Sequence, residues 1–358
     1  MNILDIIEKK RDAKELNKEE IEFFVKGYTD GSIPDYQAAA LVMAIYINGM
    51  TKEETTNLAL AMAYSGDVLD LSDIGEVVDK HSTGGIGDKI TLILMPIVAA
   101  LGVKVAKMSG RGLGATGGTK DKLEAIPGYR TEIGIDEFIE NVKKIGISLI
   151  GQTLNLAPAD KKLYALRDTI SCTANIPLIS SSIMSKKIAA GANKIVLDVT
   201  CGSGAFMKTV GEARELSKTM IDIGKLANKE TVCIITNMDQ PLGTMVGNTL
   251  EVIEAIETLK GNGPKDFVLL CETLGSYMLV LAKVAKDFDE GLSMIRDAIN
   301  SGKALEKLRV FIENQGGNKN VVDDYTLLPQ ASKIVPIKSN KSGYISKIEA
   351  EEVGIAAM

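Results

Sequence analysis

Apolar and polar positions follow two different patterns along this chain, and the change between them divides it. The first 65 residues are patterned as helices throughout, with short polar links such as "GYTDGSI" and "INGM" between them. Two of these helices begin with the spacing of a capping box, Asn17 with Glu20 and Thr51 with Glu54, and Pro34 suits the first turn of another. The pattern predicts a compact helical bundle at the N-terminus.

From about residue 76 the pattern changes to short strand-like runs separated by longer helical stretches. The runs predicted as strands are 76–81, 103–109, 147–152, 194–200 and 231–237. Strands that alternate with helices of this length need crossover connections. They therefore predict an α/β fold with a mainly parallel, buried sheet.

The segment 158–191 is helical without a strand pattern, and we expect it to rejoin the N-terminal helices. This predicts a small helical domain built from 1–65 and 158–191, a larger α/β domain built from 66–157 and 192–330, and a cleft between the two. Alternation typical of strands resumes near the end of the chain and then stops. Residues 331–358 are therefore predicted as the start of an incomplete C-terminal α+β piece.

Composition excludes some classes of function. The chain of 358 residues is 45% hydrophobic and 25% charged, as ordinary soluble proteins are, and its net charge of -6 argues against a general nucleic-acid binder. Tryptophan is absent and only 4% of residues are aromatic, so a stacking surface for single-stranded nucleic acid is not expected.

The four cysteines lie far apart, which is typical neither of a zinc site nor of a disulfide framework. The N-terminus carries charges where a signal peptide needs an apolar core. The longest apolar run, 92–103, contains a proline and is too short to cross a bilayer. We therefore expect a reduced, cytoplasmic protein that contacts neither nucleic acid nor membrane.

Two glycine-rich turns, "STGGIGD" and "SGRGLGATGGTKD", follow the first two predicted strands. Neither is a Walker loop or a dinucleotide-binding fingerprint. Taken singly, each could also be an ordinary connecting turn between a strand and a helix. The carboxyl ends of parallel strands converge on one crevice, however, and cationic and hydroxyl side chains gather at these ends. The residues concerned are Lys80, Ser82, Lys107, Ser109, Arg111 and Thr119. Together with backbone amides they would match a phosphate dianion, unless they are only solvated loop residues and caps.

His81 is the only histidine of the chain and lies between Lys80 and Ser82. A lone histidine at a strand end is often only a hydrogen-bonded structural residue. Beside an anion site, however, it is placed to donate a proton to a leaving group.

A second group of polar residues lies in "RDTISCTANIPLISSSIMSKK", residues 167–187. Pro177 can start a helix, which would place Ser182 and Lys186 on one face, with Arg167 at the end of the preceding helix. An arginine, a serine and a lysine can hold a planar ring with two carbonyls and stabilise negative charge on it. The alternative is a pair of solvated surface cations.

Four segments resemble the signatures of the thymidine and pyrimidine-nucleoside phosphorylase family, in the same order and over essentially the whole chain. They are "DKHSTGGIGDK", "KMSGRGLGATGGTKDKLEAIPG", "LYALRD" followed by "IPLISSSIMSKKIAAGA", and "MDQPLGTMVGN". The resemblance implies a homodimer with a small α domain and a larger α/β domain. It implies phosphorolysis of a pyrimidine nucleoside to free base and (deoxy)ribose 1-phosphate, without a redox cofactor or catalytic metal.

Carried over by position, the resemblance implies a phosphate site, a base site and a cation site. Phosphate would be held by Lys80, Ser82, Thr91, Lys107, Ser109 and Thr119. The base would be held by Arg167, Ser182 and Lys186, with His81 near its O2 as a proton donor or hydrogen-bond partner. A structural monovalent cation such as K⁺ would be held by Gly87, Lys89, Leu242, Met245 and Glu254.

The chain departs from the family pattern at two positions near the expected cleft. Most relatives have histidine where this chain has Ala115, and they usually have lysine where it has Thr200. Uridine or thymidine preference does not follow from the sequence. The family's C-terminal domain is also longer than the piece expected at 331–358.

Three other functions compete with the phosphorylase interpretation. "VLDVTCGSGAF" resembles the cofactor loop of amino-methyltransferases, but the N-P-P-[YF] or D-P-P-[YF] motif of those enzymes is absent. A phosphoribosyltransferase of similar architecture would need a magnesium-diphosphate site, for which Asp88 and Asp121 are the available acids. A nucleoside-binding protein with weakened catalysis is the third, and Ala115 and Thr200 favour it.

Overall fold

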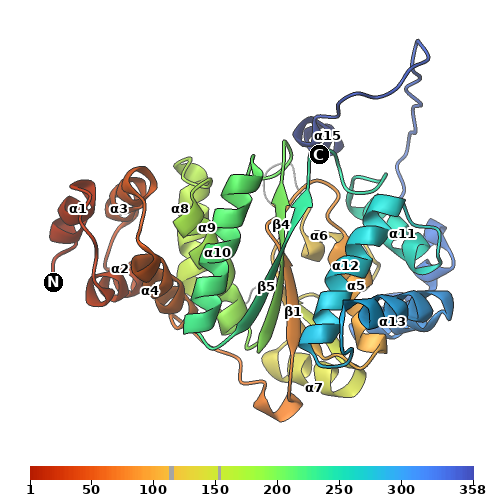
Figure 1. The fold of residues 1–358 in the computed structure, drawn as a ribbon, viewed down its shortest axis with the longest axis horizontal. Coiled ribbons are helices and arrows are strands. Elements are labelled where there is room, and N and C mark those ends of the chain that lie inside the picture. The colour runs from red at the N-terminus through yellow and green to blue at the C-terminus, as the bar shows by residue number, and fades with distance from the viewer. Residues whose placement is uncertain (113–116, 152–154) are drawn as a thin grey trace. The chain divides into compact units, whose positions relative to one another are not determined.

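The computed structural model describes residues 1–112, 117–151 and 155–358 (Figure 1). The chain forms two compact units. Each unit is assembled from separate stretches of sequence. The first contains Met1–Thr83, Gln152–Val199 and Thr209–Ile235, and the second contains Gly84–Gly151, Thr200–Lys208 and Thr236–Met358. These units place the strand residues 78–82, 194–199 and 230–235 with the helical bundle, whereas the sequence-based division assigned all strands to the α/β domain.

Four helices open the first unit, as predicted: α1 (Ile3–Arg11), α2 (Lys18–Asp30), α3 (Asp35–Asn48) and α4 (Lys52–Ala63). Both predicted capping boxes are present, at the starts of α2 and α4. Pro34 lies just before the first turn of α3, as its N-cap. Satisfying the first amides of α2 and α4 in this way fixes where each helix begins.

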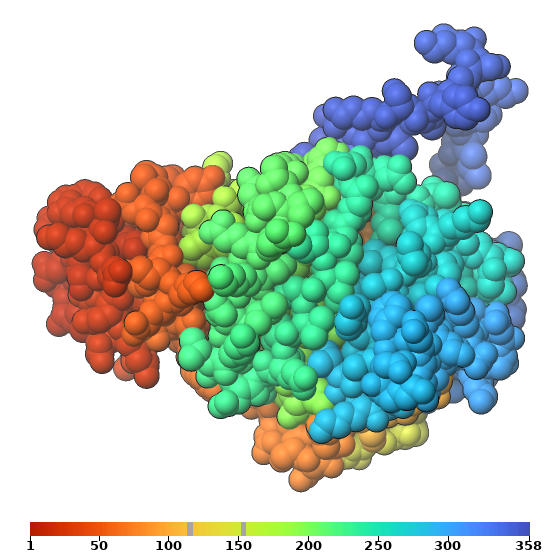
Figure 2. Space-filling view, viewed as in Figure 1, coloured from red at the N-terminus to blue at the C-terminus, as the bar shows by residue number. Residues whose placement is uncertain are grey.

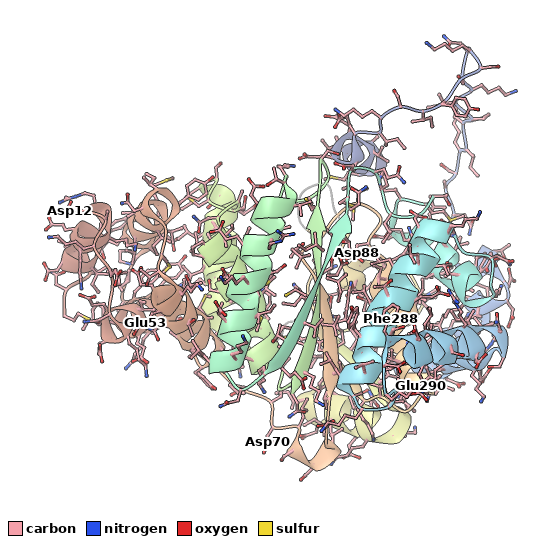
Figure 3. The ribbon with its side chains drawn as sticks, in the orientation of Figure 1. Asp12, Glu53, Asp70, Asp88, Phe288 and Glu290 are labelled. Carbon is pink, nitrogen blue, oxygen red and sulfur yellow. The ribbon has the colours of Figure 1, made fainter. Side chains whose placement is uncertain are left out.

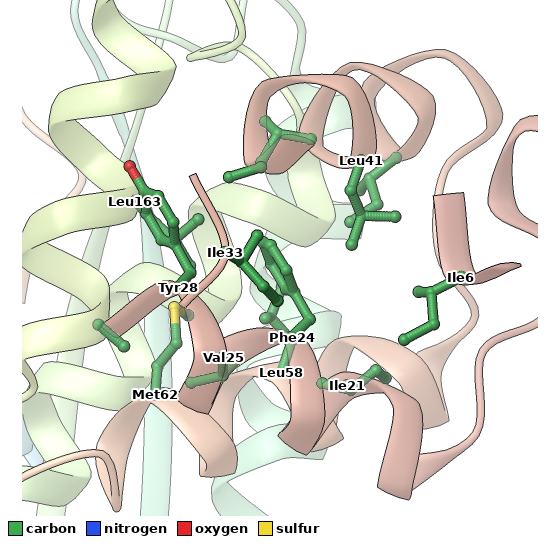
Figure 4. Packing of buried hydrophobic residues seen from close by; sticks show 14 of the residues in the cluster. Ile6, Ile21, Phe24, Val25, Tyr28, Ile33, Leu41, Leu58, Met62 and Leu163 are labelled. Atoms are coloured by element: carbon green, nitrogen blue, oxygen red, sulfur yellow. The ribbon is translucent and has the colours of Figure 1, made fainter. Parts of the chain in front are cut away.

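The bundle buries one continuous apolar core, seen closely in Figure 4. Phe24 and Tyr28 of α2 stack with ring centroids 6.2 Å apart, and Leu163 joins them from a later helix. Residues from the N-terminal segment and from the segment after residue 158 therefore share one core. The segment after residue 158 thus packs against the N-terminal helices.

The first unit also holds most of a three-stranded sheet and the helices that cover it, while the strand ends 200–201 and 236–237 belong to the second unit. The strands of this sheet, in the order β1-β4-β5, are β1 (Val78–Ser82), β4 (Lys194–Cys201) and β5 (Glu230–Asn237). β1 and β4 are parallel, with His81 opposite Leu197. The helices are α8 (Pro158–Thr169), α9 (Ile176–Ala189) and α10 (Val210–Leu226), and α9 contacts both α4 and α10 (Figure 1).

The second unit holds a parallel pair of strands, β2 (Val105–Ser109) and β3 (Ile147–Gly151). Its main helices are α5 (Ile90–Ala100), α6 (Thr119–Glu124), α7 (Ile135–Ile145), α11 (Asn248–Leu259), α12 (Lys265–Leu281), α13 (Phe288–Asn300) and α14 (Lys303–Asn314). Its short 3-10 turns are Lys319–Val322 and Tyr325–Leu327, and a further one, Ser72–Ile74, belongs to the first unit. All five predicted strands are present across the two units, and each lies between helices as predicted.

The fully buried Gln315 closes one edge of the two-stranded sheet. Its side-chain oxygen accepts from the Leu149 amide at 2.8 Å, and its side-chain nitrogen donates to the Leu149 carbonyl at 2.8 Å. Its backbone carbonyl also accepts from the Arg130 amide at 2.9 Å. A single side-chain amide thus makes the bonds that a neighbouring strand would make.

The expected strands after residue 330 are not formed. Between residue 328 and α15 (Ala350–Ala357), coloured blue in Figure 2, the described chain has neither helix nor strand. Its large apolar side chains, such as Ile337 and Tyr344, are exposed. Alternation alone cannot make a strand, because a strand needs a partner to satisfy its amides and carbonyls. Among the described residues, no helix has both the length and the hydropathy that crossing a membrane requires.

Candidate active site

Three residues predicted to hold a base lie together in the first unit. Arg167 lies in the last turn of α8, and Ser182 and Lys186 lie one turn apart on α9. The Lys186 Nζ donates to the Ser182 hydroxyl at 2.8 Å, which confirms that the two share one helix face. The alternative of two solvated surface cations is wrong, because Arg167 is only 3% exposed and the Lys186 side chain only 20%.

Arg167 is fixed by the connection between α8 and α9. Its guanidinium donates to the carbonyl oxygens of Cys172, Thr173 and Leu178 at 3.0, 2.7 and 2.8 Å. These bonds use three of the five N–H donors of an arginine. Burial lowers the pKa of the group from its ordinary value, but not enough to discharge a guanidinium.

Two residues that the sequence analysis did not single out belong to this group. The buried Asp160 carboxylate accepts from the Lys186 Nζ at 2.7 Å. The Tyr164 ring lies 5.6 Å from both the Lys186 Nζ and the Arg167 Cζ. Asp160, Tyr164 and Arg167 are spaced i, i+4, i+7 on α8. That spacing is the signal by which they could have been found.

Opposing effects set the charge of Lys186. Burial lowers its pKa most, the Asp160 carboxylate raises it, and the nearby Lys187 and Arg167 lower it further, so that the net direction is downward. The ammonium has a carboxylate at one side and a hydroxyl at another. It is a hydrogen-bond donor of fixed direction.

A cavity of about 10 Å³ lies between this polar group and the apolar core of the bundle. Arg167, Ser182 and Asp160 form its polar side, and Phe24 and Leu58 are among its apolar lining. This volume suits a single water molecule and not a pyrimidine ring. The cavity therefore separates the polar group from the core without being a base pocket.

Strand periodicity places His81 relative to its neighbours on β1. Successive side chains of a strand point to opposite faces, so Asp79 and His81 share one face while Lys80 and Ser82 share the other. Asp79 accepts from Lys187 of α9 at 2.6 Å, which identifies its face as the one toward α9. The Lys80 Nζ lies 3.7 Å from the buried Asp198 carboxylate of β4. His81 is therefore on the side of α9, the helix that carries Ser182 and Lys186.

The other predicted phosphate residues belong to the second unit. Lys107 and Ser109 lie on one face of β2, with Ser109 at its carboxyl end, and Thr119 is the first residue of α6. Thr91 is the second residue of α5, a helix whose N-cap, Lys89, makes no side-chain cap. Lys107 and Thr91 are buried. A strand end followed by a helix start is the local geometry predicted for both turns.

Two of the backbone amides in the second glycine turn are not free for an anion. The Asp121 carboxylate accepts from the amides of Gly112 and Gly118 at 2.7 and 3.1 Å. The exposed Arg111 bonds Asp121 and Glu124 at 2.7 and 2.8 Å, so it stabilises the turn. The Asp121 carboxylate therefore stabilises the glycine turn itself, through Arg111 and these two amides.

One of the two departures from the family pattern can be described. Thr200 is buried on β4, and its hydroxyl donates to the Gly84 carbonyl of the first glycine turn at 2.6 Å. It thus ties that turn to the strand. Ala115 lies outside the described residues.

The residues predicted to hold a monovalent cation converge in the second unit, but around a side chain. The Lys89 Nζ donates to the carbonyls of Leu242 and Met245 at 2.7 and 3.0 Å and lies 2.5 Å from Glu254. Burial alone would raise the pKa of Glu254, but the bonds from Lys89 and Thr244 outweigh it and lower the pKa. A lysine within the expected ligand set does not fit a cation site, because its ammonium repels a second cation.

Comparison with known protein families matches two models. One is described as "Glycosyl transferase family, helical bundle domain" and matches residues 4–66; the other, "Glycosyl transferase family, a/b domain", matches residues 74–305.

The chain is also similar to curated proteins named pyrimidine-nucleoside phosphorylase. It is 56% identical to those of Geobacillus stearothermophilus and Bacillus subtilis, over 100% of this chain and 83% of each relative. It is 55% identical to that of Staphylococcus aureus over the same shares.

Among solved structures, the fold resembles anthranilate phosphoribosyltransferase from Thermus thermophilus. The TM-score is 0.72 at 18% sequence identity, and the match covers 86% of this chain and 98% of that one. At this identity the likeness supports the fold alone: a helical bundle joined to an α/β part with parallel strands.

Proposed function

The chain belongs to the pyrimidine-nucleoside phosphorylase family of glycosyl transferases, and on that premise we propose that it converts a pyrimidine nucleoside and phosphate into free base and (deoxy)ribose 1-phosphate. The reaction is a pentosyl transfer and is reversible. The observation that carries the proposal is the group of Arg167, Lys186 and Ser182. It presents two fixed cations and a hydroxyl from two adjoining helices.

This group suits the negative charge that the departing base gains. When the glycosidic C1′–N bond breaks, its electron pair stays on the base, and its carbonyl oxygens become strong acceptors. Arg167 and Lys186 donate charge-assisted hydrogen bonds that strengthen as this charge develops, which is the property that lowers the barrier. His81, on the side of α9, would supply the proton that neutralises the base.

Phosphate is the proposed nucleophile. One of its oxygens forms the new bond to C1′ on the face opposite the base, while its charge stabilises the positive character of the sugar. We assign phosphate binding to Lys80 and Ser82 of β1, and to Thr91, Lys107, Ser109 and Thr119. Their cationic and hydroxyl groups at strand ends and helix starts support the assignment. No redox cofactor or catalytic metal takes part, and we expect the reaction in the cytoplasm.

We also propose a homodimer formed through α3. This helix is apolar nearly all round, and Tyr36, Met43 and Ile47 lie on one exposed stripe at i, i+7 and i+11. Tyr36 is 75% exposed and Ile47 is 71% exposed. A contiguous apolar stripe of this kind is typical of a protein–protein interface.

The activity is tested by incubating the full chain with uridine, thymidine or deoxyuridine, with and without phosphate, and separating base from nucleoside. Base release that requires phosphate and proceeds without Mg²⁺ is expected. No release from the nucleosides, but release from a pyrimidine nucleoside 5′-monophosphate that requires Mg²⁺ and diphosphate, would instead indicate a phosphoribosyltransferase. Saturable nucleoside binding with no release would leave a binding protein as the function.

A further inference from the structure

Lys89 reaches from the first glycine turn into a buried group of oxygen atoms in the second unit. Lys89 follows Asp88, which is labelled in Figure 3. The Lys89 side chain is fully buried. Its Nζ has three oxygen partners at 2.5–3.0 Å: the carbonyls of Leu242 and Met245 and the Glu254 carboxylate. The Phe267 ring centroid lies 5.1 Å away and adds a cation–π contact.

The backbone around this ammonium leaves no room for larger residues. Gly87 and Gly243 both have positive φ, of 78° and 72°. A Cβ at Gly243 would lie 3.0 Å from the Lys89 Nζ and 2.5 Å from a Glu254 oxygen, and one at Gly87 would lie 2.7 Å from the Leu242 carbonyl. Two amides of the loop 242–245 also bond Glu254, which accepts from Thr244 at 2.9 Å and Met245 at 3.3 Å. The loop is therefore organised around one buried positive charge.

Two carbonyls and a carboxylate at these distances are the donor set of a desolvated monovalent cation. An ammonium and a potassium ion have the same charge and similar size, so either could organise the loop. We propose that the Lys89 ammonium is this protein's own tethered cation: it takes the place of a bound K⁺ in the group formed by Leu242, Met245 and Glu254. The chain therefore needs no K⁺ there.

The inference goes beyond the phosphorylase activity and is tested by stability. Thermal unfolding of the full chain is followed by circular dichroism at constant ionic strength, with either K⁺ or tetramethylammonium as the cation. Three variants are compared with the wild type. Lys89→Ala removes the ammonium and opens space, and Lys89→Met removes the charge but fills the space. Lys10→Met breaks another buried ion pair, in which a single carboxylate, Glu54, is the partner at 2.8 Å.

We expect the wild type to unfold at the same temperature in both salts. All three variants should lose about 5–10 °C in tetramethylammonium, since each leaves a buried carboxylate without its charge partner. Lys89→Ala alone should regain most of this loss in K⁺, saturably, because the ion enters the vacated position. Tl⁺, which substitutes for K⁺, should give a bound ²⁰⁵Tl resonance with Lys89→Ala and none with the wild type.

Two results would overturn the proposal. One is a saturable K⁺-dependent rise in the unfolding temperature of the wild type, which would mean that a cation binds beside Lys89. The other is a Lys89→Ala protein that stays destabilised equally in both salts, which would make the contact an ordinary ion pair. Neither result depends on whether the protein releases a base from a nucleoside.

Discussion

At the scale of single residues, Lys186 and Asp160 form the pair on which the proposed chemistry most depends. Lys186 donates to the base only as an ammonium, yet burial lowers its pKa below the ordinary lysine value of 10.5. The Asp160 carboxylate at 2.7 Å opposes this effect. Asp160 thus acts on the base through another side chain and is a positioning residue.

Replacing Asp160 by asparagine should shift the pH dependence of kcat/KM. Activity is lost as the pH rises through the pKa of Lys186, because the neutral amine no longer stabilises a negative base. Without the carboxylate charge that pKa falls further, so the alkaline limb of kcat/KM should shift to lower pH in Asp160→Asn. A purely structural role for Asp160 would lower the rate at every pH and leave the limb where it is.

Lys186→Met should lower kcat/KM by about 10²–10³-fold, the usual cost of losing one charge-stabilising donor. Phosphorolysis rates measured beside the wild type check this, with Lys161→Met, an exposed lysine of the same helix α8 as Asp160, as the matched control. An unchanged far-UV circular dichroism spectrum confirms folding. Equal rates for Lys186→Met and the control would remove Lys186 from the active site.

The role of Arg167 is tested better by lysine than by alanine, because the guanidinium also holds the connection between α8 and α9. Its three bonds to the 172–178 connection mean that Arg167→Ala should both abolish activity and loosen the link between α8 and α9. Arg167→Lys keeps the charge but not the planar fork, so we expect it to fold with a lowered unfolding temperature and a large loss of kcat/KM. Wild-type kinetics from Arg167→Lys would contradict the assignment.

At the scale of elements, Glu54 joins three pieces of the bundle. It caps α4 through the Thr51 amide at 2.7 Å, pairs with Lys10 of α1 at 2.8 Å and accepts from the Leu16 amide at 2.8 Å. Both charged side chains are buried, with exposed fractions of 4% and 2%. The cap that the sequence spacing reveals is therefore only one part of what this residue does.

Urea unfolding should separate these parts. Thr51→Ala removes the cap alone and should cost about 0.5–2 kcal/mol. Glu54→Ala also leaves the Lys10 ammonium buried without a partner and should cost about 3–5 kcal/mol. Similar costs for the two variants would mean that the Lys10 pair contributes nothing beyond the cap.

Most elements could be predicted because their patterns are local. A capping box such as Asn17 with Glu20 lies within one turn, and the strand runs are bounded by glycine turns. The structure of the segment after residue 330 could not be predicted from its alternating pattern, because the segment has no partner strand among the described residues. In the site, Ser182 and Lys186 followed from helix spacing, whereas the Lys89 bonds to a loop 153 and more residues away did not.

At the scale of the whole molecule, the exposed stripe on α3 predicts self-association. Ile47→Glu should place a charge in the proposed interface and yield a monomer, measured by light scattering on a sizing column at several concentrations. Leu269→Glu, at a leucine 63% exposed on α12, is the matched control and should leave the oligomer unchanged. A wild type that is monomeric at every concentration would refute the proposed dimer.

The closure of the β3 edge by Gln315 has a consequence for synthesis on the ribosome. The side chain that completes the edge lies 166 residues downstream of Leu149, so it is translated long after the strand that it protects. Until residue 315 emerges, a nascent chain presents an apolar strand with an open edge. Stalled chains that end before this glutamine should bind chaperones more than chains that end after it.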